Sequence, residues 1–238
     1  MLSAFIDEIE WITFPLTKDG AIYPGFSARS YFHLSAYSDA LFAEAEIPFS
    51  DMLARSVPKR RAEFLAGRCL AKQVLSKLGY AGFILNNAED RSPRWPDDVS
   101  GSLSHNVNSV LCAAHIHSRD LPCVGVDIET FMSEKRAQEL WPGLVDEEEY
   151  RWLNAQDDSF HRLLTLNFSA KESLFKALYP QIKHYFDFFD ARMIALDNVG
   201  QSFELELLTD LTSEFHAGRR FRGTYLQRPD DITTFLCC

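Results

Sequence analysis

Two long segments with the apolar spacing of a buried helix constrain this chain most, because each must cover its apolar face with a sheet or another helix. The first begins at Pro58, with Ser56 as a candidate cap and Gly79 as a plausible stop. The second runs over residues 160–178, and we expect Pro180 to end it. The fold is therefore expected to form around two helices.

Short strand-like segments bounded by turn residues accompany both helices. They are residues 109–114, 123–129, 188–196, 202–208 and 220–227. Residues 133–154 read as helical, with the acidic run 146–149 as a first turn that suits the helix dipole. This order of elements is a mixed α+β pattern. We expect two similar-sized lobes, residues 1–120 and 121–238, with a cleft between them.

The charge distribution points to a localised anion site. The chain has 238 residues, with 24 Lys and Arg against 34 Asp and Glu, which gives a net charge of −10. That balance speaks against a general nucleic-acid binder, which is net basic. Between Arg55 and Lys77, however, seven basic residues stand against one acid, Glu63. An acidic protein with one basic segment suggests that this segment meets an anionic ligand.

The five cysteines are odd in number and have no CxxC spacing. A disulfide framework or a zinc site is therefore not expected, and a reducing cytosol fits best. Cys69, Cys112 and Cys123 sit among apolar residues and are expected to pack as small hydrophobes. The apolar runs are shorter than the roughly 18 residues of a membrane span. Asp7 and Glu8 do not suit a signal peptide, so we expect a cytoplasmic protein.

Two pairs of charged residues carry the first candidate chemistry. Asp127 and Glu129 are two apart on an expected strand and so share one face. Neighbouring carboxylates repel unless a cation neutralises them, and Mg²⁺ takes one or two carboxylates together with phosphate oxygens. Glu172 and Lys176, at i and i+4 of the second helix, could add a third carboxylate and a phosphate contact. Ordinary surface acids and a surface ion pair remain the alternatives.

A serine and histidine pair follows a loop rich in proline and glycine. A lone histidine is more often structural, but Ser104 and His105 beside a turn could also donate to phosphate oxygens. The chain has no Walker loop, no GxGxxG and no HExxH. A Ser-His nucleophile has no supporting GxSxG.

Five motifs occur in order along the chain: VPKRRAEFLAGR at 57–68, RSPRWP at 91–96, GSLSH at 101–105, VGVDIE at 124–129 and FSAKESLFKA at 168–177. Taken together, they resemble the 4'-phosphopantetheinyl transferases of the surfactin type, and most closely their siderophore branch. They span about half of the chain. Many relatives have Trp where this chain has Phe168, and the siderophore branch accepts Phe there.

This resemblance implies an α+β fold of two subdomains related by pseudo-twofold symmetry, with coenzyme A between them, acting as a monomer. It implies an enzyme that transfers the 4'-phosphopantetheine moiety of coenzyme A to a serine of an apo carrier protein. The other product is adenosine 3',5'-bisphosphate. Mg²⁺ is the implied metal, and the implied pathway makes a siderophore or another nonribosomal peptide.

Motif by motif, the resemblance also implies residue roles. Asp127, Glu129 and Glu172 would hold Mg²⁺, and Glu172 would also take the proton from the carrier serine. Lys176 would neutralise the pyrophosphate as the leaving group forms. Asp127, Lys176 and, with a less defined role, Lys171 are implied contacts of the coenzyme.

The remaining implied contacts lie in the first half of the chain. Those expected to bind coenzyme A phosphates are Arg60, Arg68, Ser104 and His105. Arg91 and Pro93 would lie near the adenine. Lys59, Arg61 and Lys72 are close enough in sequence to share or exchange roles with the two arginines.

Two other readings stay open from the residues alone. An acid-x-acid strand with a Glu/Lys pair loosely resembles a Mg²⁺-dependent nuclease, although the net charge of −10 opposes nucleic-acid binding. A non-catalytic protein that binds coenzyme A or the carrier is the second reading. The complete set of three carboxylates and Lys176 argues against it.

Overall fold

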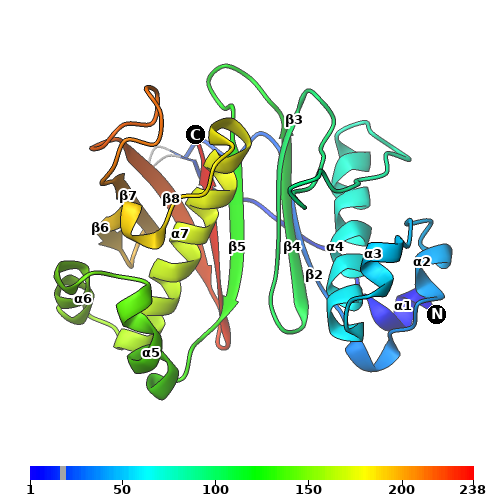
Figure 1. The fold of residues 1–238 in the computed structure, drawn as a ribbon, viewed down its shortest axis with the longest axis horizontal. Helices are drawn as coiled ribbons and strands as arrows, with labels where there is room; N and C mark the ends of the chain where they lie inside the picture. Colours follow the sequence, from blue (N-terminus) through cyan, green and yellow to red (C-terminus); the bar gives the residue numbers. More distant parts are fainter. Residues whose placement is uncertain (17–19) are drawn as a thin grey trace. The chain divides into compact units, whose positions relative to one another are not determined.

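The computed structural model describes residues 1–16 and 20–238. The chain forms two compact units. Unit 1 comprises Met1–Thr13 and Tyr23–Ser118, and unit 2 comprises Phe14–Ile22 and Arg119–Cys238. Each unit packs one long helix against an antiparallel sheet (Figure 1). The expected α+β class is thereby confirmed.

Unit 1 is built from a four-stranded sheet of order β1-β2-β4-β3 and the helix α4. Its strands are β1 (Glu10–Ile12), β2 (Phe26–Tyr31), β3 (Val99–His105) and β4 (Ser109–Ile116). Its helices are α1 (Leu2–Phe5), α2 (Leu41–Glu44), α3 (Asp51–Ala54) and α4 (Pro58–Lys77), with a 3₁₀ turn η1 at Leu34–Ala36. The core of the unit lies between α4 and the sheet.

The helix α4 begins at Pro58, as expected, but Val57 rather than Ser56 is its N-cap, and no side chain caps it. The proline explains why none is needed, because it removes one of the unpaired N–H groups of the first turn. Leu65 and Leu70 are fully buried on the apolar face. The helix ends before Gly79, whose φ of +96° suits a residue without Cβ.

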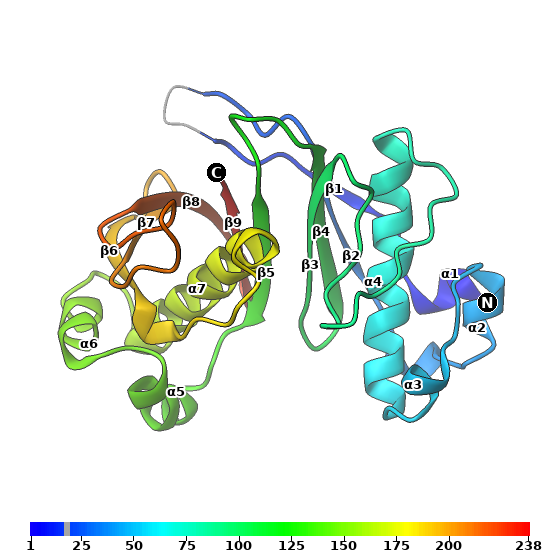
Figure 2. The ribbon, with the colours of Figure 1, turned by 45° about the horizontal axis from the view of Figure 1, so that its top comes forward.

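Unit 2 is built from a five-stranded sheet of order β5-β9-β8-β7-β6 and the helix α7. Its strands are β5 (Val124–Thr130), β6 (Ala191–Asp197), β7 (Ser202–Leu207), β8 (Arg220–Gln227) and β9 (Asp231–Cys237). Its helices are α5 (Glu134–Leu140), α6 (Glu147–Asn154) and α7 (Phe160–Ile182), with 3₁₀ turns η2 at Trp141–Gly143 and η3 at Phe188–Asp190. Figure 2 shows α7 lying across the sheet beside β5.

Two expectations about helices need correction here. The helix α7 continues through Pro180 to Ile182 and ends where Lys183 turns left-handed at φ +54°. A proline in the last turn removes only one hydrogen bond, so the helix does not stop there. The expected helix over 133–154 is two short helices, because Pro142 and Gly143 interrupt it. Asp146 caps the second of these by accepting from the Glu149 N–H at 2.8 Å.

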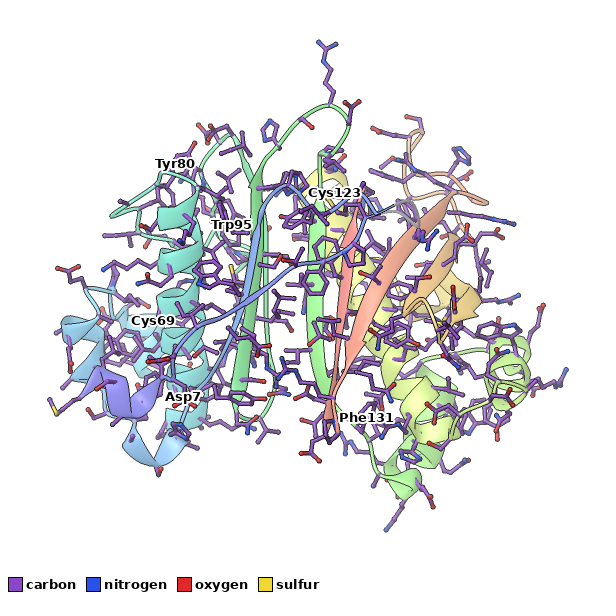
Figure 3. All side chains as sticks on the ribbon, turned by 180° about the vertical axis from the view of Figure 1, so that it is seen from behind. Asp7, Cys69, Tyr80, Trp95, Cys123 and Phe131 are labelled. Carbon is purple, nitrogen blue, oxygen red and sulfur yellow. A yellow bond between two sulfur atoms is a disulfide. The ribbon has the colours of Figure 1, made fainter. Side chains whose placement is uncertain are left out.

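The cysteine expectation is also wrong at one position. Cys123 forms a disulfide with Cys238 (Figure 3) instead of packing as a free thiol. The two residues are 115 apart in the sequence, and they meet because β5 pairs with β9 with Val124 opposite Cys237. Pairing between the first and last strands of a unit cannot be read from cysteine spacing.

No helix among residues 1–16 and 20–238 is long and apolar enough to cross a membrane.

A close approach between β5 and α7 determines the geometry of unit 2. A Cβ placed on Gly125 would lie 1.8 Å from the carbonyl oxygen of Ser173 and 2.9 Å from the backbone N of Ala177. Glycine is therefore required at this position, and it brings the strand into contact with the backbone of the helix.

We expect Gly125→Ala to destabilise the protein by about 3 kcal/mol or more, because overpacking against backbone atoms cannot be relieved by a side-chain rotation. Gly67→Ala is the matched control. It lies inside α4 with no atom within 4 Å of its added Cβ, so it should stabilise by about 0.5–1 kcal/mol. Chemical denaturation of both variants tests the pair of effects. Equal stability of Gly125→Ala and the unmodified chain would contradict the packing described here.

Candidate functional site

The first group of site residues lies where β5 meets α7 in unit 2. Asp127 and Glu129 are on the same face of β5 as Gly125, which is the face that contacts α7. Lys176 of α7 donates to Asp127 Oδ1 at 2.6 Å. Glu172, one turn earlier, lies on the same side of the helix as Lys176. The structure thus brings together the four residues that the sequence pairs separately.

Burial makes this group electrostatically costly. It raises the pKa of Glu129 to about 8, with a further increase from Asp127 and a smaller one from Glu172, against the opposing charge of Lys176. Burial also raises the pKa of Glu172, and Asp127 adds to the increase while Lys176 opposes it. The three carboxylates therefore lie within electrostatic range of one another, and a single lysine does not offset their burial.

The chemistry of these residues fits a hard divalent cation. Three carboxylates offer only oxygen ligands, which Mg²⁺ prefers, and an added positive charge would oppose the burial that raises the pKa of Glu129 and of Glu172. As the side chains stand, the described residues contain no finished set of three His, Cys, Asp or Glu ligands. Asp127 is instead neutralised by Lys176.

Lys171 lies next to Glu172 in sequence but points into the fold. Its side chain is 3% exposed, and its ammonium donates to Glu149 Oε2 at 2.7 Å. It also donates to the carbonyl oxygens of Phe188 at 2.9 Å and Leu144 at 3.1 Å. Since an ammonium has three N–H bonds, this placement leaves none for a coenzyme phosphate. The expected coenzyme contact is not supported by these bonds.

Aromatic side chains from the segment after α7 lie beside the acidic group. Phe188 packs on Phe168 with ring centroids 5.4 Å apart, and Tyr185 packs on Phe175 at 5.6 Å. Burial and nearby acids, Glu172 among them, raise the pKa of Tyr185, which places its hydroxyl within electrostatic range of Glu172. Sequence reasoning missed Tyr185, although the aromatic run YFDFF at 185–189 was a visible signal.

The second group of site residues lies in unit 1. Arg60, in the first turn of α4, donates to His105 Nε2 at 2.8 Å across the end of β3. The carboxylate of Glu63 is 3.6 Å from Arg60 and 3.8 Å from His105. Ser104 is buried, and because neighbours on a strand face opposite ways it lies on the other face from His105. The structure therefore brings His105, but not Ser104, to Arg60.

Arg68 is a buried guanidinium with an aromatic and an amide as neighbours. It lies over the ring of Phe64 with 4.4 Å to the centroid and donates to Asn87 Oδ1. Burial lowers its pKa to about 10. Within the described chain no carboxylate forms an ion pair with it. A buried cation with so little compensation favours the approach of an anion.

The loop that carries Arg91 is held against β3 by an aromatic contact. The indole of Trp95, labelled in Figure 3, is the side chain that an added Cβ on Gly101 would meet, at 2.5 Å from the ring. Pro93 forms an isolated bridge with Asn87. Arg60 and Arg91 both line a cavity of about 650 Å³ in unit 1, while Pro93 is not among its lining residues.

The other basic residues of α4 do not line this cavity, and Arg68 lines a different one together with Lys72. Arg61 is held by Asp39 at 2.7 Å and by two backbone carbonyls. Lys72 is held by Glu46 at 2.7 Å and by a backbone carbonyl. Lys59 lies 3.9 Å from Glu63. Arg61 and Lys72 thus have structural partners of their own.

Comparisons with known proteins show which family the chain is similar to. The family model described as the 4'-phosphopantetheinyl transferase N-terminal domain matches residues 49–115, and the model of the 4'-phosphopantetheinyl transferase superfamily matches residues 123–226. The chain is 34% identical to enterobactin synthase component D of Salmonella typhi over 86% of this chain and 84% of that protein. It is 36% identical to the Escherichia coli K12 protein of the same name over 61% of this chain and 69% of that protein. It is 30% identical to the 4'-phosphopantetheinyl transferase Npt of Nocardia iowensis over 66% of this chain and 72% of that protein.

The raised pKa of Glu129 predicts a pH-dependent stability of the metal-free protein. The folded chain holds this proton more tightly than the unfolded one, so the contribution is present at low pH and is lost as the pH rises toward about 8. Glu129→Gln cannot ionise and should lose less thermal stability than the unmodified chain between about pH 5 and about pH 8. Thermal melts in EDTA measure the difference. The exposed Glu147→Gln serves as control and should follow the unmodified chain, and parallel profiles for all three proteins would refute the assignment.

Proposed function

The chain belongs to the 4'-phosphopantetheinyl transferase superfamily, and from this membership we propose which residues carry the reaction and which pathway it serves. The enzyme transfers the 4'-phosphopantetheine moiety of coenzyme A to carrier proteins. The observation that carries the residue assignment is that Asp127 pairs with Lys176 while Glu129 and Glu172, both partly buried, lie within electrostatic range of Asp127.

Members of this family use coenzyme A as substrate together with Mg²⁺. We assign Asp127, Glu129 and Glu172 as the residues that hold the metal, because they supply three oxygen ligands whose burial without a cation is unfavourable. Bound there, Mg²⁺ supplies a Lewis acid and a template for the pyrophosphate.

Glu172 handles the proton that the carrier serine loses, and Lys176 balances negative charge on the phosphates. Glu172 accepts the proton of the carrier serine as the serine oxygen bonds to the β-phosphorus and the bond from that phosphorus to the bridging oxygen breaks. The leaving group is adenosine 3',5'-bisphosphate. Lys176 offers a point charge to the phosphates.

Unit 1 binds the nucleotide end of coenzyme A through Arg60, Arg68 and His105. Arginine suits fixed phosphate contacts, and Arg60 lines the cavity of about 650 Å³ with Arg91. This volume is in the range of small-molecule sites. We keep Arg91 and Pro93 as candidates for the adenine end. Ser104 stays a candidate with weaker support, since it lies on the opposite face of β3 from His105.

The relatives favour a siderophore pathway for the carrier substrate. Six of them carry the name enterobactin synthase component D. We propose that this chain modifies a carrier protein or carrier domain of a nonribosomal siderophore synthetase, and that it does so as a monomer in the cytoplasm.

Replacement of Glu172 by Gln tests the catalytic assignment. The variant should transfer at least a hundredfold more slowly, as expected for loss of a general base, while still binding coenzyme A. Intact mass of an apo siderophore carrier after incubation with coenzyme A and Mg²⁺ measures transfer. Mg²⁺ should raise the melting temperature of the unmodified chain more than that of the variant. Unchanged transfer would overturn the base assignment, and an equal Mg²⁺ shift would overturn the metal assignment.

Replacement of Arg60 by Gln tests the phosphate contacts of unit 1. Loss of a charge-assisted hydrogen bond worth about 1.5–3 kcal/mol should raise KM for coenzyme A by about 10- to 150-fold with a smaller effect on kcat. Lys77→Gln is the matched control on the same helix, because Lys77 is exposed in the last turn of α4 and lies over the ring of Trp11. Its KM for coenzyme A should stay within about twofold. A larger rise for the Lys77 variant than for the Arg60 variant would reverse the assignment.

A further inference from the structure

An ion pair between Lys171 and Glu149 is the most completely buried charge pair in the described part of unit 2. The two side chains are 3% and 2% exposed, and Nζ lies 2.7 Å from Oε2. The free energy needed to remove two charges from water offsets much of their mutual attraction. A protein with a hydrophobic pair of similar volume in their place can therefore be as stable. Stability alone does not explain why these two residues are charged.

The hydrogen bonds of this pair join four separate segments. Lys171 of α7 binds the carbonyl oxygens of Leu144, before α6, and of Phe188, after α7. Glu149 of α6 accepts at Oε1 from the backbone N–H of Met193 in β6 at 2.7 Å. The same oxygen accepts from the Asn167 side chain at 2.6 Å, one turn before Lys171. The pair is thus a polar centre on which α6, α7, β6 and the segment after α7 converge.

Two of these connections act on the neighbourhood of Glu172. Residues 171 and 172 are about 100° apart around the helix, so fixing Lys171 inward fixes the rotation of α7 and the direction of Glu172. The bond to the Phe188 carbonyl ties the segment 183–190 to the helix. That segment carries Tyr185 beside Glu172 and stacks Phe188 on Phe168.

We propose that Glu149 and Lys171 form a positioning pair for the transfer reaction. The pair holds α7 in the rotation that presents Glu172 to β5 and holds the segment 183–190 against the same face of the helix. Lys171 acts through these contacts and does not touch the coenzyme. The proposal rests on the proposed role of Glu172 as base.

The test separates position from stability with single and double variants. Glu149→Gln and Lys171→Met each leave a buried charge without its partner and should lower the melting temperature. The double variant removes both charges and should recover most of that loss. Its kcat should nevertheless remain about ten- to a hundredfold below that of the unmodified chain, as expected for a misplaced catalytic group. KM for coenzyme A should stay within about twofold, because the contacts of unit 1 are untouched.

Hydrogen exchange shows whether loss of the pair loosens the tethered segment in particular, while the comparison of kcat with melting temperature separates positioning from stability. In the double variant the amides of residues 184–190 should exchange faster, while those of β5 and β9 keep their protection. Glu147→Gln, on the exposed side of α6, is the control and should change neither exchange nor kcat.

Recovery of both stability and kcat in the double variant overturns the proposal. If the double variant does not fold, Glu149→Gln assayed far below its melting temperature decides, since an unchanged kcat there also overturns it. If neither variant folds, exchange in the unmodified chain decides: protected amides over residues 184–190 support the tether, and fast exchange refutes it. Failure of the proposed function is a separate result, seen as full activity of Glu172→Gln.

Discussion

Contact between a strand and a helix backbone underlies the chemistry of this enzyme. At Gly125 the strand β5 touches the carbonyl oxygen of Ser173 so closely that no side chain fits. Two residues further along the same face, this proximity puts Asp127 within 2.6 Å of Lys176. A wider spacing would separate the acids of the strand from the acid of the helix. Gly125 therefore allows the close packing that brings the acidic pair of β5 next to the charged face of α7.

In unit 1 a strand glycine also allows a close approach, and there it positions a loop. Gly101 on β3 accepts the ring of Trp95, and this contact holds the loop that carries Arg91 near the start of α4. In each unit a glycine on a strand allows a close approach that a side chain would prevent. The close partner in unit 1 is an indole, and in unit 2 it is a helix backbone. In each case the glycine lies within a few residues of groups assigned to the reaction.

Local sequence patterns predicted the elements that depend on apolar spacing. They failed for elements that depend on pairing between strands far apart in the sequence. The helix α4 was predicted nearly to its last residue, and Asp127 and Glu129 were placed on one strand face. The strand β9 was not predicted, because Thr233 and Thr234 are polar yet buried among neighbours from distant segments. The strand β3 was read in part as a loop because of Gly101. The Cys123–Cys238 disulfide depends on the pairing of β5 with β9, which no local signal reveals.

The two lysines of the motif on α7 show how far a site can be read from sequence. Lys171 and Lys176 are five residues apart, which is about 140° around a helix. They therefore point in different directions, one into the interior of unit 2 and one toward β5. Lys176 retains 25% exposure and pairs with one carboxylate of the acidic group, whereas Lys171 is 3% exposed and saturated by a carboxylate and two carbonyls. A charge that remains partly accessible can serve a substrate phosphate, while a saturated one can only hold structure in place. Within one motif, exposure can therefore distinguish a side chain that is able to reach the substrate from one that acts through the residues around it.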